Sequence, residues 1–334
     1  MHLEIRDFTE ADYPAGVAIA NRAFPEYPDT ADEWRHWDRH RNPKLRFRRF
    51  VAEMGGQVVA YGQYDQDEGM YHPDKYQLEI TVDPGCRRQG IGSVLYDHIA
   101  ASLAPLDPLA YWINVREDIT DGLRFVARRG YAETMRTWEN HLNMASFDPA
   151  PFDGTIENVE ASGIALRTFA ELRAEEPAFF DKLYDMIDEV HHDVPSVDPA
   201  TSVEREPWIE RVKNHPNLMP DGYFIAVDGD RYIGLSTLFR SEAADFLYTG
   251  LTGTRRAYRR RGIALALKLK ALAYAGSIGC PLVKTWNAST NTGMLAINQA
   301  LGFKKQPAWI FHALALRPEA TDAAEVEREL VPAG

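Results

Sequence analysis

The feature that most constrains the fold is an internal repeat with a spacing of 172 residues. The segment RRQGIG at residues 87–92 recurs as RRRGIA at 259–264, and the pair Gly130-Tyr131 recurs as Gly302-Phe303. The opening segment LEIR at 3–6 resembles IALR at 164–167. A period this long indicates a duplicated domain, because solenoid proteins repeat units of about 20–50 residues. We therefore predict two domains, residues 1–150 and 160–334, joined by a stretch rich in Pro, Asp and Ser.

Both copies predict the same order of elements. A strand (3–6; 164–168) and a helical stretch precede a hairpin that turns at 55–56 in the first copy and at 228–230 in the second. A fourth strand (77–82; 246–252) then leads into a helix (90–103; 262–275). A fifth strand ends at Asn114 or Asn287, a second helix ends before Gly130 or Gly302, and a last strand follows. We also expect an acidic surface helix over 318–330.

Composition and charge exclude several classes of protein. The chain of 334 residues is 45% hydrophobic and 26% charged, as an ordinary globular protein is. Its net charge of −12 repels a phosphate backbone, so nucleic acid is not an expected partner. No apolar run is long enough to cross a membrane, and residues 1–7 do not resemble a signal peptide. We expect a cytoplasmic protein without a membrane partner; the sequence does not predict its oligomeric state.

A basic, glycine-containing turn follows the fourth expected strand of each copy. In the first copy, Pro84 ends strand pairing, and Gly90 and Gly92 open the next helix. The first amides of a helix lack internal partners and lie at the positive end of its dipole, which makes them an anion site. The second copy places five arginines within residues 255–261. In a chain of net charge −12, this local positive charge predicts an anion-binding site.

The glycine spacing separates this turn from other phosphate-binding loops. A P-loop needs Gly-Lys-Ser/Thr, which is absent, and a dinucleotide fingerprint needs a third glycine where Leu95 stands. The remaining pattern, Arg/Gln-x-x-Gly-x-Gly/Ala between a strand and a helix, resembles motif A of the GNAT acetyltransferases, which holds the pyrophosphate of coenzyme A. Residues 286–303, with Asn287, Asn291 and Gly302, resemble the later part of the family pattern.

The resemblance covers nearly the whole chain as a tandem pair. It implies an α/β (α+β) fold with two GNAT-like domains, each a mixed, mostly antiparallel sheet flanked by helices. It also implies acetyl-CoA as co-substrate, without a metal. The residues that it places on coenzyme A are Val82, Arg87, Arg88, Gln89, Gly90, Ile91, Gly92 and Asn114 in the first copy, and Thr254, Arg259, Arg260, Arg261, Gly262, Ile263, Ala264, Asn287 and Asn291 in the second.

Direct acetyl transfer to an amine needs a base, a donor to the thioester oxygen and a proton for the departing thiolate. The resemblance implies that a strand amide near Val82 or Thr254 contacts the oxygen. Many family members carry a Tyr four residues before the glycine that ends the last helix, whereas this chain has Val126 and Asn298 there. Glu79 and Tyr248, on the fourth strands, are the candidate bases. Because Asn298 can donate a hydrogen bond and valine cannot, the sequence favours the second copy as the catalytic one, and the opposite assignment stays open.

The sequence constrains the acceptor of the acetyl group less than it constrains the donor. The run His191-His192-Asp193 has no third metal ligand at a clear spacing and favours a surface helix end, where His192 and Asp193 are candidate substrate contacts. We expect an N-acetyltransferase acting on a small-molecule amine. Two alternatives remain, a protein-lysine acetyltransferase and a non-catalytic acyl-CoA-binding sensor or partner-binding module.

Overall fold

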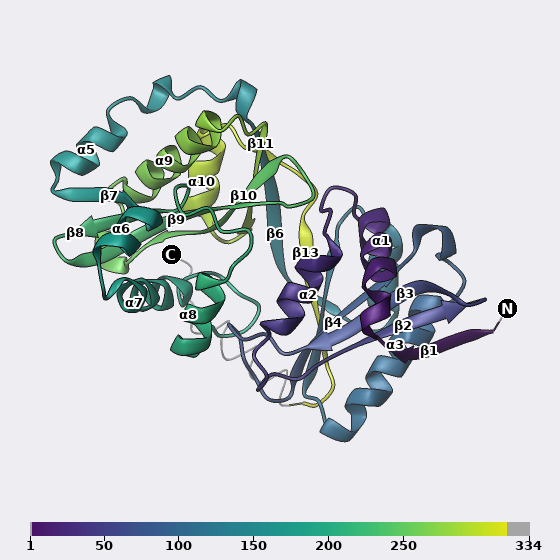
Figure 1. The fold of residues 1–334 in the computed structure, drawn as a ribbon. Coiled ribbons are helices and arrows are strands. Elements are labelled where there is room, and N and C mark those ends of the chain that lie inside the picture. Colours follow the sequence, from purple (N-terminus) through teal and green to yellow (C-terminus); the bar gives the residue numbers. More distant parts are fainter. Residues whose placement is uncertain (1, 319–334) are drawn as a thin grey trace. The chain divides into compact units, whose positions relative to one another are not determined.

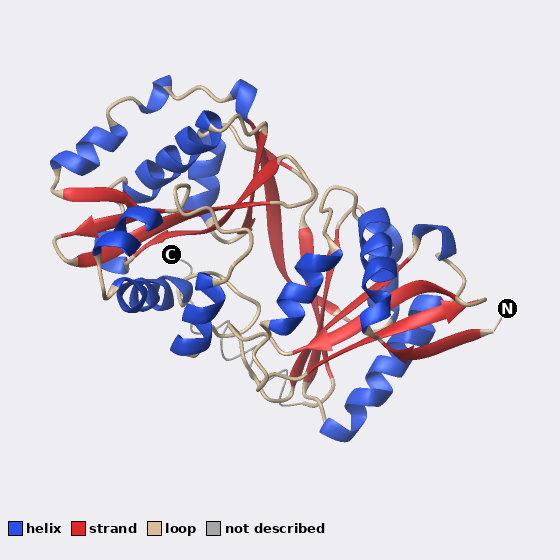
Figure 2. Cartoon of the chain, viewed as in Figure 1, coloured by secondary structure: helices blue, strands red, loops and turns tan. Residues whose placement is uncertain are grey.

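The computed structural model describes residues 2–318 and divides the chain into two compact units (Figures 1 and 2). The first unit comprises Met1–Met135 with Trp309–Gly334, and the second comprises Arg136–Ala308. The helix expected over 318–330 falls, beyond residue 318, outside the described residues. In the described part of the chain, no helix has both the length and the apolar character needed to cross a membrane.

The first unit is built on a six-stranded sheet. In sheet order its strands are β1 (Leu3–Asp7), β2 (Phe47–Met54), β3 (Gln57–Asp65), β4 (Lys75–Val82), β5 (Ala110–Arg116) and β13 (Trp309–Ala315). All neighbours are antiparallel except β4 and β5, which are parallel. Gly55 and Gly56 turn the β2–β3 hairpin with φ of 62° and 77°, a conformation that glycine adopts without a steric penalty.

Helices cover both faces of this sheet. On one face lie α1 (Tyr13–Ala23) and α2 (Ala31–Arg39), where Ile19 and Trp34 pack against Tyr61 of β3. On the other lie α3 (Ile91–Leu103) and α4 (Thr120–Arg128), where Leu95 and other apolar residues pack against Leu78 of β4. Side chains alternate along each strand, so neighbouring residues of β3 and β4 enter different cores.

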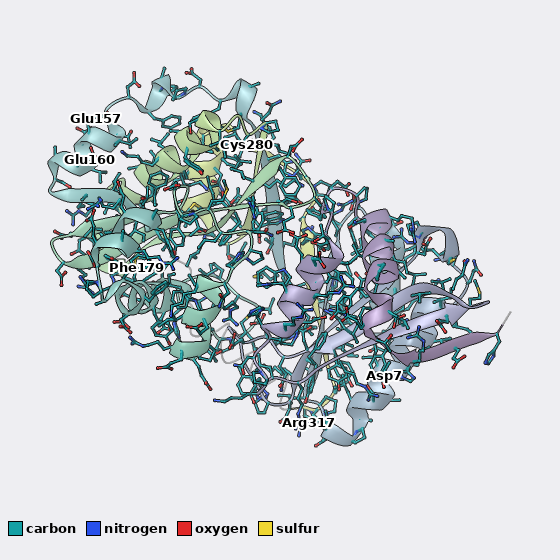
Figure 3. The ribbon with its side chains drawn as sticks, viewed as in Figure 1. Asp7, Glu157, Glu160, Phe179, Cys280 and Arg317 are labelled. Carbon is teal, nitrogen blue, oxygen red and sulfur yellow. The ribbon has the colours of Figure 1, made fainter. Side chains whose placement is uncertain are left out.

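The second unit repeats this plan. Its sheet order is β7 (Ile164–Thr168), β8 (Phe224–Asp228), β9 (Arg231–Arg240), β10 (Phe246–Thr254), β11 (Leu282–Ala288) and β6 (Ala132–Asn143), with β12 (Lys304–Lys305) also paired to β6. Its helices are α5 (Thr155–Ala161), α6 (Phe169–Glu175), α7 (Phe179–His191), α8 (Arg205–Lys213), α9 (Ile263–Ser277) and α10 (Thr292–Ala300). Phe179, labelled in Figure 3, is 1% exposed and anchors α7 in a core with Phe169 of α6.

Each unit takes its last strand from the other repeat. β6 ends the first repeat but pairs with β11 along Leu282–Ala288, and β13 ends the second repeat but pairs with β5 along Ala110–Arg116. The compact units therefore differ from a division near residues 150–160, which follows the order of the repeats. The mixed, mostly antiparallel sheets flanked by helices confirm the predicted fold class and its tandem duplication.

The parallel strands diverge in both units. β4 and β5 pair only where Lys75–Gln77 faces Ala110–Trp112, although β4 continues to Val82. Likewise, β10 and β11 pair only where Phe246–Tyr248 faces Leu282–Lys284. Beyond these pairs, a gap opens in the middle of each sheet, next to the basic turn that follows β4 or β10.

Candidate active site

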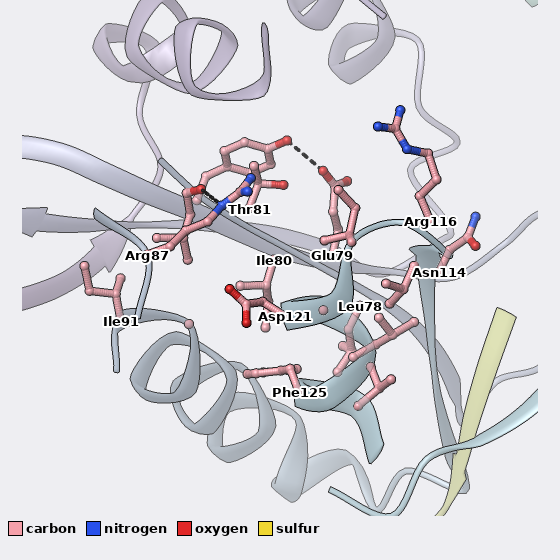
Figure 4. Close-up of a pocket in the computed structure, with 18 of the residues that line it drawn as sticks. Leu78, Glu79, Ile80, Thr81, Arg87, Ile91, Asn114, Arg116, Asp121 and Phe125 are labelled. Atoms are coloured by element: carbon pink, nitrogen blue, oxygen red, sulfur yellow. Dashed lines mark hydrogen bonds between the residues drawn. The ribbon is translucent and has the colours of Figure 1, made fainter. Parts of the chain in front are cut away.

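A cavity of about 750 Å³ occupies the gap between β4 and β5 in the first unit (Figure 4). Its walls come from the turn after β4, the two diverging strands, α4, the loop after α1 and Trp309 of β13. Eight residues expected on the sequence evidence line it, namely Glu79, Val82, Arg87, Arg88, Gly90, Ile91, Gly92 and Asn114.

The turn after β4 is a cradle for an anion. Arg88 and Gly90 have φ of 65° and 83°, the left-handed conformation that points successive amides into one concavity. A Cβ at Gly90 would have no atom within 4 Å, so this side of the turn is open. No described residue accepts a hydrogen bond from the backbone amide of Gly90, Ile91 or Gly92. These free donors at a helix start, with Arg87 beside them, fit a pyrophosphate.

The backbone of β4 directs an amide into the gap. The amide of Asp83 donates to the carbonyl of Val59 on β3, at 2.9 Å. Successive amides of a strand point to opposite sides, so the amide of Val82 points away from β3 toward the gap. In the second unit, the amide of Arg255 donates to the carbonyl of Ile233 at 2.9 Å. The amide of Thr254 therefore points away from β9, toward the gap between β10 and β11. Both expected oxyanion donors therefore face their gaps.

The cavity reaches both faces of the sheet. Ile80 and Val82 belong to the core under α3, whereas Glu79 and Thr81 point to the α1 face. Arg116 and Trp309 are cross-strand partners and share a face, and the Arg116 guanidinium lies 5.8 Å from the ring of Phe24, just after α1. We call the two parts of the cavity the turn half, next to Gly90, and the α1 half, next to Glu79.

Glu79 is a carboxyl group suited to accept a proton. It lines the cavity, and the hydroxyl of Tyr61 donates to its Oε1 at 2.7 Å (Figure 4). Burial raises the pKa of Glu79, and the hydrogen bonds from Tyr61 and Thr81 oppose this rise. A carboxylate with a raised pKa is a stronger base at neutral pH than an exposed one.

The basic turn of the second unit has the same backbone but different surroundings. Arg260 and Gly262 have φ of 63° and 77°, matching their counterparts in the first copy. However, the carboxylate of Asp193, just after α7, accepts from Arg256 Nε at 2.7 Å and also pairs with Arg259. These arginines hold the pKa of Asp193 below its usual range. An internal anion thus already pairs with two arginines of this turn.

Two positions along β10 also differ from their counterparts along β4. The position of Thr81 is taken by Gly253, where a Cβ would lie 2.5 Å from Val190 of α7. The position of Glu79 is taken by Leu251, which has no proton to exchange.

Four other predicted residues of the second unit, Asn287, Asn291, Asn298 and Tyr248, have structural partners. Asn298 is 1% exposed, and its Nδ2 donates to Asn287 Oδ1 at 2.6 Å. Asn291 caps α10 by accepting from the amide of Met294. The ring of Tyr248 stacks on Phe239 with centroids 5.4 Å apart.

The histidine run ends α7, as expected from the sequence. His191 is the last helical residue, and His192 Nδ1 contacts the carbonyl of Asp188 at 2.7 Å. Within residues 2–318, no group of three or more His, Cys, Asp or Glu side chains could hold a metal ion.

Sequence reasoning missed much of the α1 half. Phe24, Tyr27 and Asp29 follow α1 and line the cavity together with Arg116 and Trp309. No motif marks these positions. Trp309 lies in the second repeat of the sequence, and only the strand exchange brings it to the first unit.

A sheet that opens between two parallel strands beside an anion-binding turn is the architecture of a GNAT acyltransferase. The chain matches the family model "Acetyltransferase (GNAT) family" over residues 4–131 and again over 181–303. It therefore belongs to this family, with one match in each copy.

Relatives and solved structures match most of the length of the chain. The chain is 26% identical over 239 residues to a mycothiol acetyltransferase of Actinosynnema mirum, covering 71% of this chain and 74% of the relative. It is 22% identical over 277 residues to one from Catenulispora acidiphila, covering 80% of each chain. A tandem GNAT protein from the clavulanic acid biosynthesis pathway superposes with a TM-score of 0.71 at 19% identity, covering 95% of this chain and 99% of that one. A GCN5-related N-acetyltransferase from Sphaerobacter thermophilus gives a TM-score of 0.70 at 21% identity, covering 95% and 96%.

Proposed function

We propose that the chain transfers an acetyl group from acetyl-CoA to the amine of a small molecule, and that the reaction takes place in the first unit. The observation that carries this proposal is the cavity of about 750 Å³, which joins an open anion cradle to the half-buried carboxyl group of Glu79 through the gap in the sheet. The preference for the second copy, based on Asn298 and Tyr248, is therefore reversed.

Coenzyme A fits the turn half of the cavity. The free amides around Gly90 and the side chains of Arg87 and Arg88 would hold its pyrophosphate. Bound acetyl-CoA supplies the activated acetyl thioester. The direction of the Val82 amide suits it to donate to the thioester oxygen as negative charge develops there.

Glu79 is the proposed base. An alkyl ammonium has a pKa of about 10.4, so freeing its lone pair at pH 7 costs about 4–5 kcal/mol. Glu79 takes this proton, directly or through water. The nitrogen then forms a bond to the acetyl carbon and loses its second proton to solvent as the carbon–sulfur bond breaks. Val126 lines the cavity but has no proton to donate, so the departing thiolate takes its proton from solvent.

Calorimetric titration with acetyl-CoA tests the site. We expect one site per chain, lost in Gly90→Trp and retained in Gly262→Trp. The two variants are matched, because both glycines have a positive φ, 83° and 77°, at a helix start. Loss of binding in Gly262→Trp alone would show that acetyl-CoA binds in the second unit. Absence of binding in the unmodified chain would refute the proposal.

The alternative is a non-catalytic acyl-CoA-binding module. Val126 favours it, because the position that carries a tyrosine in many family members holds a buried, inert side chain here. Release of free thiol from acetyl-CoA, measured with a broad panel of amines, separates the two functions. Binding without thiol release on any acceptor would support the module.

A further inference from the structure

The α1 half of the cavity carries three aromatic rings. The rings of Phe24 and Tyr27 lie 5.5 and 5.9 Å from that of Trp309, centroid to centroid. All three are half-buried and line the cavity. Aromatic rings gain most when their faces are covered by another flat or apolar group. These rings therefore offer a surface that a ligand in the cavity can cover.

The polar groups beside these rings favour a cation without a carboxylate. Glu79 and Asp29 both line the cavity. The nearby cation, Arg116, is already engaged by Asp118 at 2.7 Å and Glu26 at 3.4 Å. An anionic group of a ligand would find this arginine neutralised by two carboxylates, whereas an ammonium group would be attracted to the acidic groups and to the ring faces.

Asn114 adds an unused acceptor on the same side. Its Oδ1 is buried, and no described residue donates a hydrogen bond to it. Strand alternation places Asn114 on the face of Arg116, toward α1 and away from the turn. A buried carbonyl oxygen without a donor is costly, so a ligand N–H at this point gains a hydrogen bond and removes that cost.

We propose that the α1 half binds the acceptor, and that the acceptor is a primary amine joined by a short chain to a flat aromatic ring, without a carboxylate. The ring packs against Trp309 and Phe24, and the ammonium group lies toward Glu79 and Asn114. This inference rests on the proposed function, because the amine must approach a thioester held in the turn half.

A binding experiment tests the inference without turnover. The full chain, saturated with coenzyme A, is titrated calorimetrically with 2-phenylethylamine, 2-cyclohexylethylamine and phenylalanine. We expect the aromatic amine to bind about twofold to tenfold more tightly than its cyclohexyl counterpart, and phenylalanine, which adds a carboxylate, not to bind measurably. Equal affinity for the two amines, tighter binding of phenylalanine, or no binding of the aromatic amine would overturn the proposal.

Two variants of one residue locate the ring. In Trp309→Ala, 2-phenylethylamine is expected to bind no more tightly than 2-cyclohexylethylamine. Trp309→Phe should retain most of the difference in affinity between the two amines. The affinity for coenzyme A should be unchanged in both variants. An unchanged preference in folded Trp309→Ala would refute the role of this ring.

Turnover then separates this inference from the proposed function. Acetylation of aliphatic amines without an aromatic preference would overturn the acceptor class and leave acetyl transfer standing. Tight binding of the aromatic amine without thiol release would support the acceptor class and overturn acetyl transfer.

Discussion

Replacing Tyr61 by Phe should move the acid limb of the pH–rate profile to higher pH. The Tyr61 hydroxyl, on a side chain only 3% exposed, donates to Glu79 at 2.7 Å. This hydrogen bond stabilises the charged carboxylate and so lowers the pKa of Glu79, against the raising effect of burial. A hydrogen bond to a charged group contributes about 1.5–3 kcal/mol. At 1.36 kcal/mol per pKa unit, its loss raises the pKa by about one to two units.

The measurement is kcat/KM for one amine between about pH 5 and 9, because this quantity reports ionisations of the free enzyme and free substrate. Glu79 acts as a base only when deprotonated, so a higher pKa shifts the rising limb upward. Ionisation of the amine is common to both enzymes and cancels in the comparison. Tyr64→Phe is the matched control, because Tyr64 lies on the same strand but in the core under α3. An unmoved limb in a folded Tyr61→Phe enzyme would refute Glu79 as the base.

Three further predictions concern stability. Gly62→Ala should lower the free energy of unfolding in urea by about 1–3 kcal/mol, because its Cβ would lie 2.9 Å from Ile99, whereas Gly293→Ala, with no atom within 4 Å, should not. Burial lowers the pKa of Lys268 to about 8, below the unfolded value of about 10.4, so the free energy of unfolding should rise as pH increases between these two values. In urea titrations, Lys268→Met should abolish this rise and should be more stable than the parent chain at pH 7. The lowered pKa of Asp193 stabilises the fold above pH 4 and less as pH falls, so Asp193→Asn should be less stable at pH 7 and converge with the parent chain in acid unfolding.

The sequence predicted the fold well because its signals are local. The helix expected over 90–103 is observed as α3 (Ile91–Leu103), since the glycines that open it and its apolar spacing are both read from neighbouring residues. The fifth strand, expected to end at Asn114, continues to Arg116. There it pairs with Trp309, almost 200 residues away, and no local pattern shows such a partner.

The candidate site also has one part that the sequence predicted and one part that it did not. The anion cradle was predicted because a run of arginines and glycines sets its own backbone conformation, with φ of 65° at Arg88 and 83° at Gly90. The α1 half was not, because Phe24 and Trp309 meet only after strand exchange and resemble ordinary core aromatics in the sequence. Tyr248 also depends on surroundings that the sequence does not show. Its position on the fourth strand suggested a base, but its ring stacks on Phe239.

The two copies show how one local sequence serves two environments. Arg260 and Gly262 keep the backbone of their counterparts, so the second turn retains the shape of an anion cradle. What differs is the end of α7, which brings Val190 against Gly253 and supplies Asp193 as an internal anion. A phosphate at the second turn would compete with Asp193 for Arg256 and Arg259, and separating a largely buried ion pair has a free-energy cost. The same ion pairs stabilise that unit. The first turn has an internal ion pair as well, between Arg88 and Asp121 at 3.0 Å, but both of these side chains are exposed, whereas Asp193 is largely buried. Duplication has therefore kept the shape of the turn and changed the carboxylate that lies beside it.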